Sequence, residues 1–391
     1  MRVVLHLFFD NLFFDNRYQL YEQFEGYENR YLLMNICPSG HYDFRMIKNR
    51  EKIIIAKTEE EWGRVISQSD IDVVVIYGLW KYVLPAYKYI PQRAKVIWWA
   101  FGKDLYEPIN APTSLLQIPV LKNETARFKN SVRVNKNEGK GKCLKFNPFL
   151  RIYSTYKKRE KFKMRERMIK RIDYCATPLP IEYEELRKIP YFHAKPFPHG
   201  IGFAKPEEAV YHVKKGSLLF EHSAYYACNH LDIFKSMINI DLSDRTVYFP
   251  INYGVQAVKE KVREYAGFNG ANTVFLDSIM SQKDYFEMMN SCSHAIFGNL
   301  RQQALGNMNA CLKKGIKIFL YKDSMNYKYY KQMGYIIFSI EEELNQMEID
   351  TPLTKEEAVH NANLFFSLAK CTSVEERLPC LQRQFDNLFE E

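Results

Sequence analysis

Residues 97–107 read Ile-Trp-Trp-Ala-Phe-Gly-Lys-Asp-Leu-Tyr-Glu, a run that changes character half-way. Residues 95–99 combine β-branched and aromatic side chains, which is typical of a buried strand. Residues 102–107 begin with glycine and are mostly polar, which is typical of a turn that opens toward solvent. Ligands of α/β proteins bind just outside the carboxyl ends of strands. The stretch therefore predicts a strand end beside a ligand site in an α/β fold.

The same alternation of short apolar runs and longer helical patterns continues along the chain. Strands are expected at residues 3–9, 31–36, 52–56, 72–77, 95–99, 174–177, 217–221, 246–250, 273–276, 294–298, 316–321 and 335–338. Strands that alternate with helices form parallel, doubly wound sheets. The predicted fold class is α/β, with two facing Rossmann-like parallel-sheet domains and a cleft between them, the architecture called GT-B.

The length of 391 residues favours two domains, because one hydrophobic core rarely serves so long a chain. Residues 189–216 are rich in proline and glycine, the composition of an interdomain linker. We expect an N-terminal domain at residues 1–200, a C-terminal domain at 201–353 and a helical tail at 354–391 that packs back on the N-terminal domain. The polar residues 123–141 are expected to form a mobile insertion.

Cysteine usage and hydropathy indicate the compartment. The eight cysteines contain no Cys-x-x-Cys pair and no Cys/His spacing typical of zinc, so we expect a reducing environment, no metal and no cofactor. The apolar run at residues 3–9 is too short for a signal peptide, and no later run approaches the ~20 apolar residues that span a bilayer. A cytoplasmic protein, soluble or peripheral to the inner face of the cytoplasmic membrane, is predicted.

Several common enzyme classes lack their motifs in this sequence. No Gly-x-Gly-x-x-Gly follows a strand, and there is no Walker loop, His-Glu-x-x-His or Gly-x-Ser-x-Gly. Dehydrogenases, nucleotide triphosphatases, zinc proteases and hydrolases are therefore disfavoured. Asp70-Ile71-Asp72 has the Asp-x-Asp form of a metal site, but it precedes its expected strand, whereas a metal site would follow one.

A strongly basic segment occupies residues 148–172. Ten Lys and Arg lie between Arg151 and Arg171, against two glutamates, and apolar residues are interleaved with them. This pattern predicts a basic helix that docks on an anionic membrane surface, with a solvated helix face as the alternative. Nucleic acid is not an expected partner, because no nucleic-acid-binding motif accompanies the charge.

The clearest ligand motif is the run Phe-Gly-Asn-Leu-Arg-Gln-Gln-Ala-Leu-Gly-Asn at residues 297–307. A strand ends here in glycine, a polar loop follows, and a helix is expected to begin at about Gln303. Free amides at a helix start, the helix dipole and the guanidinium of Arg301 together suit a diphosphate. The candidate donor-binding residues in this run are Asn299, Arg301, Gln302, Gln303 and Gly306. An ordinary helix start with a surface arginine is the alternative.

Two further strand-end loops complete the candidate donor site. Ser223 and Asn229 follow the strand at 217–221, where they can cap a helix or bind a phosphate or ribose. Tyr253 follows the strand at 246–250, where its ring can stack on a nucleobase. Three such loops on one carboxyl edge of a sheet reinforce each other.

A general base is needed if the reaction is a displacement by a sugar hydroxyl, because the hydroxyl must lose its proton. Asp104 and Asp15 are the candidate catalytic residues, since both follow strands of the N-terminal domain, and His41 and Glu107 are secondary candidates. For each aspartate, helix capping or turn formation is the alternative.

These residues resemble a known family, the TDP-N-acetylfucosamine:lipid II N-acetylfucosaminyltransferases, or 4-alpha-L-fucosyltransferases, of enterobacterial common antigen synthesis. The resemblance is carried by residues 98–107, which are similar to the family's Trp-Gly-x-Asp-Leu-Tyr-Glu. It is carried also, in the expected order over about three hundred residues, by Asn16-Arg17, Ser223 with Asn229-His230, Pro250 with Tyr253, and Arg301-Gln302-Gln303 with Gly306.

The resemblance implies a metal-independent, inverting GT-B enzyme. It would move 4-acetamido-4,6-dideoxygalactose from dTDP to a lipid-linked saccharide in bacterial surface polysaccharide synthesis. The C-terminal domain would hold the nucleotide sugar and the N-terminal domain the acceptor, with Asn16, Arg17, Trp99, Tyr106 and Glu107 as acceptor-binding residues. The chain departs from the family in its first loop, which carries Phe-Phe-Asp where His-rich residues are expected, and in residues 123–141, which look longer than the family needs.

Two other functions remain open from the sequence. A nucleotide-sugar epimerase of the same fold would need two acid/base groups at the sugar and no acceptor. A non-catalytic protein that binds a glycan or an RNA would use the basic segment, and its behaviour would not depend on Asp104 or Asp15.

Overall fold

A computed structural model describes residues 1–11, 14–106, 115–116, 118–138, 148–198, 211–212, 215–368 and 374–390. The chain forms two compact units. The first unit comprises Met1–Gln117, Asn147–Lys205 and Lys370–Glu391, and the second comprises Ile118–Phe146 and Pro206–Ala369. The chain therefore crosses between the units several times, whereas the sequence predicted one boundary near residue 200 and a return of the tail after residue 353.

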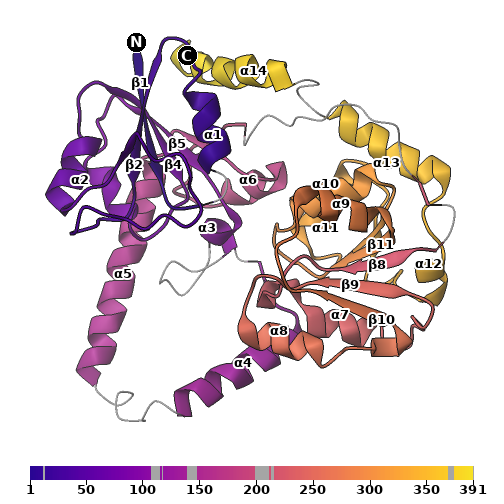
Figure 1. Cartoon of the computed structure of the whole chain (residues 1–391). Coiled ribbons are helices and arrows are strands. Elements are labelled where there is room, and N and C mark those ends of the chain that lie inside the picture. The colour runs from indigo at the N-terminus through magenta and orange to yellow at the C-terminus, as the bar shows by residue number, and fades with distance from the viewer. Residues whose placement is uncertain are drawn as a thin grey trace. The chain divides into compact units, whose positions relative to one another are not determined.

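The first unit contains a seven-stranded sheet in the order β3-β2-β1-β4-β5-β6-β7, and every pairing is parallel (Figure 1). Its strands are β1 (Arg2–Phe8), β2 (Tyr27–Leu33), β3 (Ile53–Ile54), β4 (Ile71–Tyr77), β5 (Lys95–Trp99), β6 (Tyr174–Ala176) and β7 (Lys195–Pro196). Its helices are α1 (Phe14–Tyr21), α2 (Glu59–Ile66), η1 (Leu84–Lys88), α3 (Gly102–Tyr106), α5 (Pro148–Lys170), α6 (Pro180–Leu186), α14 (Val374–Asp386) and η5 (Asn387–Phe389). The strand order reverses direction between β1 and β4, which is the switch point of a doubly wound sheet.

The second unit contains a six-stranded parallel sheet in the order β10-β9-β8-β11-β12-β13 (Figure 1). Its strands are β8 (Ser217–Phe220), β9 (Thr246–Pro250), β10 (Asn272–Leu276), β11 (Cys292–Phe297), β12 (Lys317–Leu320) and β13 (Phe338–Ser339). Its helices are α4 (Asn123–Glu138), η3 (Tyr226–Cys228), α7 (His230–Ser236), α8 (Gln256–Arg263), η4 (Phe268–Gly270), α9 (Gln282–Asn290), α10 (Leu305–Lys313), α11 (Met325–Gln332), α12 (Gln346–Asp350) and α13 (Lys355–Ser367). The prediction of two parallel, doubly wound sheets is confirmed, whereas the expected cleft between the domains stays a prediction.

Both faces of the second sheet are buried, which explains why its strands read as continuous apolar runs. Successive side chains of a strand point to opposite faces. Leu218 and Phe220 of β8 belong to one buried cluster with Phe249 and Ile296, whereas Leu219 belongs to a second cluster on the other face. Helices that cover both faces are the usual partners of an all-parallel sheet.

Helix α4 corrects the expectation of a mobile insertion for residues 123–138, and the rest of the predicted insertion, residues 139–141, lies outside the described residues. Its first turn is held by Asp232 of α7, whose carboxylate accepts from the backbone amides of Glu124 and Thr125, each at 2.9 Å. The Thr125 hydroxyl donates to the same carboxylate at 2.7 Å. Because helix amides at an N-terminus lack intrahelical partners, this contact satisfies two of them and fixes α4 to the second unit.

The C-terminal tail is divided between the units. Helix α13 lies on the second unit, where the Asn361 side chain exchanges hydrogen bonds with the backbone of Ile336 at 2.8 and 2.9 Å. Helix α14 lies on the first unit, where the Tyr27 hydroxyl donates to Asp386 at 2.7 Å and the Phe385 ring packs 5.6 Å from that of Tyr21. Packing back on the N-terminal sheet thus applies to α14 alone.

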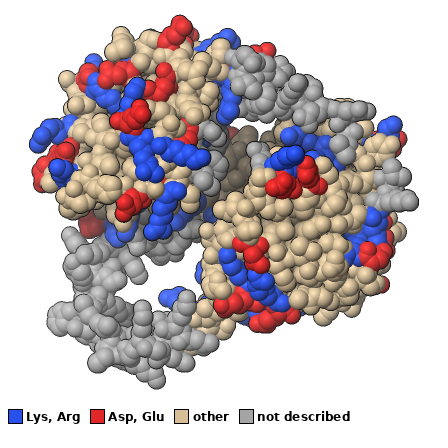
Figure 2. Space-filling model, in the orientation of Figure 1, with Lys and Arg blue, Asp and Glu red and all other residues tan. Residues whose placement is uncertain are grey.

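The basic segment forms most of α5, whose side chains are described from Arg159 onward. Several of its cations are not free at the surface: Arg165 is 2% exposed, Arg171 donates to the Ala94 carbonyl at 2.7 Å, and Lys170 pairs with Glu166 at 2.6 Å. Acidic and basic side chains are interspersed over the visible described surface of the first unit (Figure 2). Among the described residues, no helix combines the length and apolarity needed to cross a membrane. Docking of this segment on an anionic membrane stays a prediction.

Candidate functional site

The candidate site lies at the carboxyl edge of the second sheet. Strands β8, β9, β10 and β11 are neighbours and parallel, so the loops that follow them meet at one edge. Three of the four non-glycine residues with positive φ in the described chain lie in these loops: Glu221 (65°), Asn229 (53°) and Ala304 (60°). A side chain in this conformation costs on the order of 1 kcal/mol or more, and such strain clusters at functional sites.

Glu221 joins the loops after β8 and β11. Its carboxylate is fully buried, accepts from the Gly298 backbone amide, and lies 3.1 Å from Nδ1 of His222. Burial raises the pKa of Glu221, although hydrogen bonds from His222 and Gly298 oppose the rise. One carboxyl group therefore connects the loop after β8 to the loop after β11.

A chain of side-chain hydrogen bonds runs from Glu221 to Arg301. Nε2 of His222 lies 3.0 Å from Nε2 of Gln303, and Oε1 of Gln303 accepts from Nε of Arg301 at 3.1 Å. An amide nitrogen can only donate, so His222 must accept at Nε2 and carry its proton on Nδ1, toward Glu221. The buried carboxyl thus sets the tautomer of His222, and the amide of Gln303 in turn orients the guanidinium.

Helix α10 begins beside Arg301 with unpaired amides. The helix starts at Leu305, two residues later than expected from the sequence, and its N-cap Ala304 makes no side-chain capping bond. Gly306 in the first turn is exposed, and a Cβ there would meet nothing within 4 Å. The absence of a side chain at Gly306 leaves the backbone of this turn open to close approach. Free amides, a positive dipole end and a guanidinium form a suitable site for a diphosphate.

A cavity of about 280 Å³ opens next to this helix start. It is lined by His222, Pro250, Asn252, Tyr253, Leu276, Ser278, Ile279, Met280, Tyr285 and Asn307. Its position is set by Gly254, whose missing side chain lets the loop after β9 approach Ala224 so closely that a Cβ would lie 2.4 Å from the Ala224 carbonyl. Aromatic and thioether side chains with a few polar groups are typical linings of small-molecule sites.

Three predicted donor residues are engaged within the protein. Asn229 accepts from the Lys122 amide at 2.8 Å and donates to the Gly298 carbonyl at 2.8 Å. The Ser223 hydroxyl is buried between Nε2 of His222 and Sγ of Cys228, at 3.1 and 3.3 Å. Asn299 donates to the Ala227 carbonyl at 3.1 Å. These residues support the loops, whereas Arg301, Gly306 and Tyr253 are partly or fully exposed at the edge. Gln302 lies in the same loop, between β11 and α10.

Glu221, His222 and Cys228 form the one group of possible metal ligands among the described residues, with ligand atoms within 4.8 Å of one another. Burial raises the pKa of the Cys228 thiol well above its ordinary value, whereas a zinc ligand must be a thiolate. Nδ1 of His222 is directed to Glu221 and Nε2 to Gln303. The group therefore fits a hydrogen-bonded cluster better than a metal site.

In the first unit, Asp104 lies in the first turn of α3 and is 2% exposed. Its Oδ2 accepts from the Phe101 amide at 3.0 Å and from the Trp98 indole at 3.3 Å, which is the backward contact of a helix capping box. Burial raises the pKa of Asp104 to about 7, although these donors oppose the rise. The sequence predicted a strand end at Trp99 and gave helix capping as the alternative role of Asp104.

Asp15 accepts hydrogen bonds from a distant loop. The amides of Lys48 and Asn49 donate to its carboxylate at 3.0 Å, and Asp10 accepts from Arg45 at 2.7 Å and from Met46 at 3.1 Å. Burial raises the pKa of Asp15, but the amides of Asn49 and Lys48 outweigh it, and the pKa lies below its ordinary value. Two aspartates that flank the start of α1 thus fix one loop, which favours the structural alternative for Asp15.

The predicted acceptor residues are only partly brought together. The Arg17 guanidinium lies over the Trp99 ring at 3.9 Å, so these two meet. Tyr106 is buried and donates to Glu182 at 2.6 Å, so an acceptor contact by Tyr106 has no support in this geometry. Asn16 lies in α1 with its side chain outside the described part, and Glu107 lies outside the described residues.

Sequence reasoning missed two residues that organise the site. Glu221 and His222 stand in the strand-end loop, where an acid followed by histidine and serine was a visible signal, but their partner Gln303 is about eighty residues away. His41, a secondary candidate for the base, is exposed and pairs with Asp43 at 2.9 Å.

Comparisons with known proteins agree with the fold. The structure is similar to a lipopolysaccharide outer core galactosyltransferase, WaaB, with a TM-score of 0.56 and 8% identity over 99% of this chain and 98% of that one. It is similar to WaaG, a glycosyltransferase involved in lipopolysaccharide biosynthesis, with a TM-score of 0.52 and 11% identity over 97% and 98%. A trehalose-phosphate synthase (UDP-forming) from Burkholderia xenovorans has a TM-score of 0.54 and 8% identity over both full chains.

No protein-family profile and no curated protein matches the chain. Similarity at this level of identity shows the fold. The protein has the two-domain α/β fold of the GT-B type.

Proposed function

We propose that this protein is a glycosyltransferase that transfers a sugar from a nucleotide diphosphate to a glycan acceptor. The observation that carries the proposal is the uncapped start of α10, with Gly306 open and Arg301 oriented by Gln303, beside a cavity of about 280 Å³. The three similar structures, two glycosyltransferases and a synthase that forms UDP, support the same class of reaction.

On the donor side, the nucleotide occupies the cavity and the diphosphate meets α10. Tyr253 is 46% exposed at the cavity wall, which leaves its ring available to a nucleobase. The leaving group carries negative charge in the transition state, and the amides of α10 and the guanidinium of Arg301 stabilise it. These groups would take the place of a metal, so the proposed reaction is metal-independent.

On the acceptor side, Asp104 is the preferred candidate for the general base. A base works best when its pKa is near the working pH, and burial raises the pKa of Asp104 to about 7. Asp15 is a weaker candidate, because backbone amides occupy its carboxylate and its pKa lies below its ordinary value. Arg17 on Trp99 offers a cation and an aromatic face to an anionic saccharide.

The finer assignment follows the resemblance at residues 98–107 and at Arg301-Gln302-Gln303. We propose that the donor is dTDP-linked 4-acetamido-4,6-dideoxygalactose or a similar deoxy-amino sugar. The acceptor is a lipid-linked saccharide of bacterial surface polysaccharide synthesis at the inner face of the cytoplasmic membrane. The reaction inverts the anomeric centre.

A thermal-shift and calorimetric panel of dTDP, UDP and GDP, with their sugars, tests the proposal. We expect stabilisation by dTDP over UDP and GDP, and no change on adding EDTA. A preference for UDP would keep the reaction and overturn the sugar assignment, and no response to any nucleotide would overturn the function. Incubation with the bound sugar nucleotide alone adds a second test, because conversion of the sugar without an acceptor would indicate an epimerase.

A further inference from the structure

A second and larger cavity lies in the second unit, among α4, α7 and α8. Its volume is about 580 Å³, within the range of small-molecule sites. We call it the α4 groove, and its lining residues are Glu124, Arg127, Phe128, Ser131, Leu231, Phe234, Lys235, Ile238, Lys261, Tyr265 and Phe268. None of them belongs to the candidate donor site.

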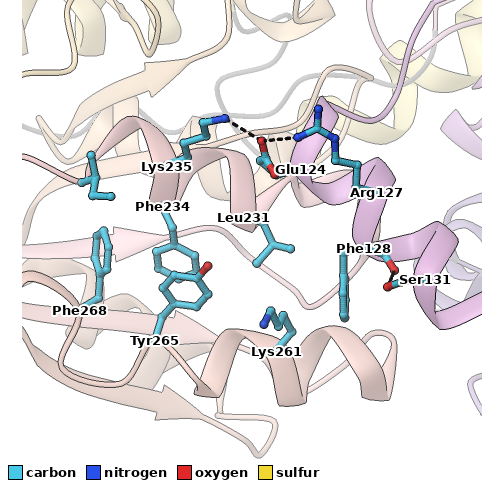
Figure 3. Close-up of a pocket in the computed structure, with 11 residues that line it drawn as sticks. Glu124, Arg127, Phe128, Ser131, Leu231, Phe234, Lys235, Lys261, Tyr265 and Phe268 are labelled. Atoms are coloured by element: carbon cyan, nitrogen blue, oxygen red, sulfur yellow. Dashed lines mark hydrogen bonds and ion pairs between the residues drawn. The ribbon is translucent and has the colours of Figure 1, made fainter.

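The floor of the α4 groove is apolar and partly open. The Phe234 ring stacks on that of Tyr265 with centroids 3.9 Å apart, and Phe268 lies 5.1 Å from Phe234. Figure 3 shows these three rings at one end of the groove and Phe128 of α4 at the other, with Leu231 between them. Ile238 is 66% exposed. An open apolar surface with a charged border is typical of a ligand or membrane contact.

The border of the α4 groove is basic. Glu124 pairs with Lys235 at 2.7 Å and with Arg127 at 3.2 Å, along one side of the groove, and Lys261 lies on the opposite side (Figure 3). Three cations therefore line the groove against the carboxylate of Glu124, and Glu264 beside the groove pairs with Lys261, which leaves one positive charge in excess. The excess of positive charge is complementary to an anionic ligand.

A small recess continues the α4 groove and contains an unpartnered imidazole. Phe128, Leu231 and Lys261 line both spaces, and His230 lines the recess. His230 is 2% exposed, and neither of its ring nitrogens has a hydrogen-bond partner. Burial lowers the pKa of His230 to about 3, so the ring is neutral at pH 7 and can still donate one hydrogen bond. Buried polar groups are normally paired, and the recess, of about 10 Å³, has room for about one water-sized atom, so this imidazole indicates a single polar ligand atom.

We propose that the α4 groove binds an anionic phospholipid. One acyl chain would lie over Phe234, Tyr265 and Leu231, and the phosphate would lie against the cations of the border. An ester oxygen of the glycerol backbone would give His230 its missing partner. The cavity volume of about 580 Å³ lies within the range of small-molecule sites, which favours a single lipid over a folded protein partner. This inference is independent of the donor site and adds a membrane contact on the second unit.

Vesicle sedimentation of the full-length protein tests the proposal. We expect binding to vesicles of phosphatidylcholine that contain about 30% phosphatidylglycerol, and little binding to vesicles of phosphatidylcholine alone. The double variant Lys235→Ala/Lys261→Ala should bind at least about tenfold more weakly, since each basic residue near an anionic surface contributes roughly fivefold. Its control, Lys283→Ala/Lys322→Ala, removes two ion-paired lysines elsewhere on the same unit and should bind like the unchanged protein.

The apolar floor needs a separate variant, because charge alone would also act at α5. Ile238→Ser should weaken vesicle binding about threefold to tenfold, whereas Met347→Ser, at a residue 69% exposed on α12, should not. Loss of binding in Lys163→Ala/Lys170→Ala with full binding in the groove variants would overturn the proposal and assign the membrane contact to α5. Equal binding by all variants would overturn it as well.

A soluble lipid distinguishes the groove from a simple anion site. Short-chain phosphatidylglycerol below its micelle concentration should raise the melting temperature of the unchanged protein more than that of Ile238→Ser. Glycerol phosphate alone should have little effect, and equal stabilisation by glycerol phosphate would contradict a lipid site. Binding of dTDP should be the same in all these proteins, so a failure here is distinguishable from a failure of the proposed function.

Discussion

The carboxyl edges of the two sheets use their polar residues in different ways. At the second sheet, Glu221, His222 and Gln303 bind one another and leave Arg301 and the amides of α10 beside an open cavity. At the first sheet, Asp104 and Asp15 accept hydrogen bonds from the backbone of their own unit. The two edges differ in that the side chains of the second leave helix amides free, which suits a diphosphate, whereas backbone amides already engage the aspartates of the first.

The largest expected effect is at the open edge. Arg301→Ala should lower the rate of sugar transfer by about 100- to 1,000-fold, because a fixed donor aimed at developing charge is lost. Gln303→Leu, which removes the acceptor that orients Arg301 and the donor to His222, should lower it about tenfold. Steady-state kinetics with the donor found in the nucleotide panel measures both, with Lys328→Ala on the exposed face of α11 as control. Unchanged rates in Arg301→Ala would show that the diphosphate does not lie at α10.

Asp104 tests whether the first edge contributes to the chemistry at all. Asp104→Asn should lower the rate by about 100-fold, because an amide cannot accept the acceptor's proton. In the unchanged protein, kcat/KM should rise with pH through about 7 as the carboxyl ionises. The asparagine side chain keeps an oxygen that can accept the hydrogen bond from the Phe101 amide. A normal rate in a folded Asp104→Asn protein would show that Asp104 only caps a helix and that another residue is the base.

The stability of the protein should depend on pH at the same residue, with the opposite sign. The pKa of Asp104 is raised from 3.8 to about 7 in the folded state, so between these values the folded protein holds a proton that the unfolded chain releases. The free energy of unfolding should therefore fall as pH rises from about 4 to 7. In urea titrations, the difference in the free energy of unfolding between pH 4.5 and pH 8 should be about 3 kcal/mol smaller for Asp104→Asn than for the unchanged protein. Parallel curves would contradict the raised pKa.

Much of this contrast could be read from local sequence, and the rest could not. The strand ends at Trp99, Phe220 and Phe297 were predictable, because an apolar run followed by a polar loop is a local pattern. The partners of the loop residues are remote: the amides of Lys48 and Asn49 lie more than thirty residues from Asp15, and Gln303 lies 81 from His222. Tertiary contacts therefore decide which carboxylates accept hydrogen bonds from backbone amides. No local sequence pattern contains these contacts.

Asp15 provides the smallest expected effect and sharpens the comparison from the structural side. Asp15→Asn keeps one acceptor oxygen but loses the charge, and should destabilise the protein by about 1 kcal/mol, the net contribution of a hydrogen bond that is partly exposed to solvent. The pKa of Asp15 lies below its ordinary value of 3.8, so this contribution is present at neutral pH and is lost as pH falls below that value. Urea unfolding at pH 7 and pH 3 measures the difference, with Asp43→Asn, whose side chain is 94% exposed, as the control.

The rate of sugar transfer completes the argument, because capping and catalysis predict different outcomes for the same substitution. A residue that only fixes the loop at residues 45–49 should leave the rate of Asp15→Asn within about twofold of the unchanged protein at a temperature where both are folded. A fall of about 100-fold without loss of stability would instead make Asp15 the base. The first edge would then resemble the second, with a polar group held ready for a ligand.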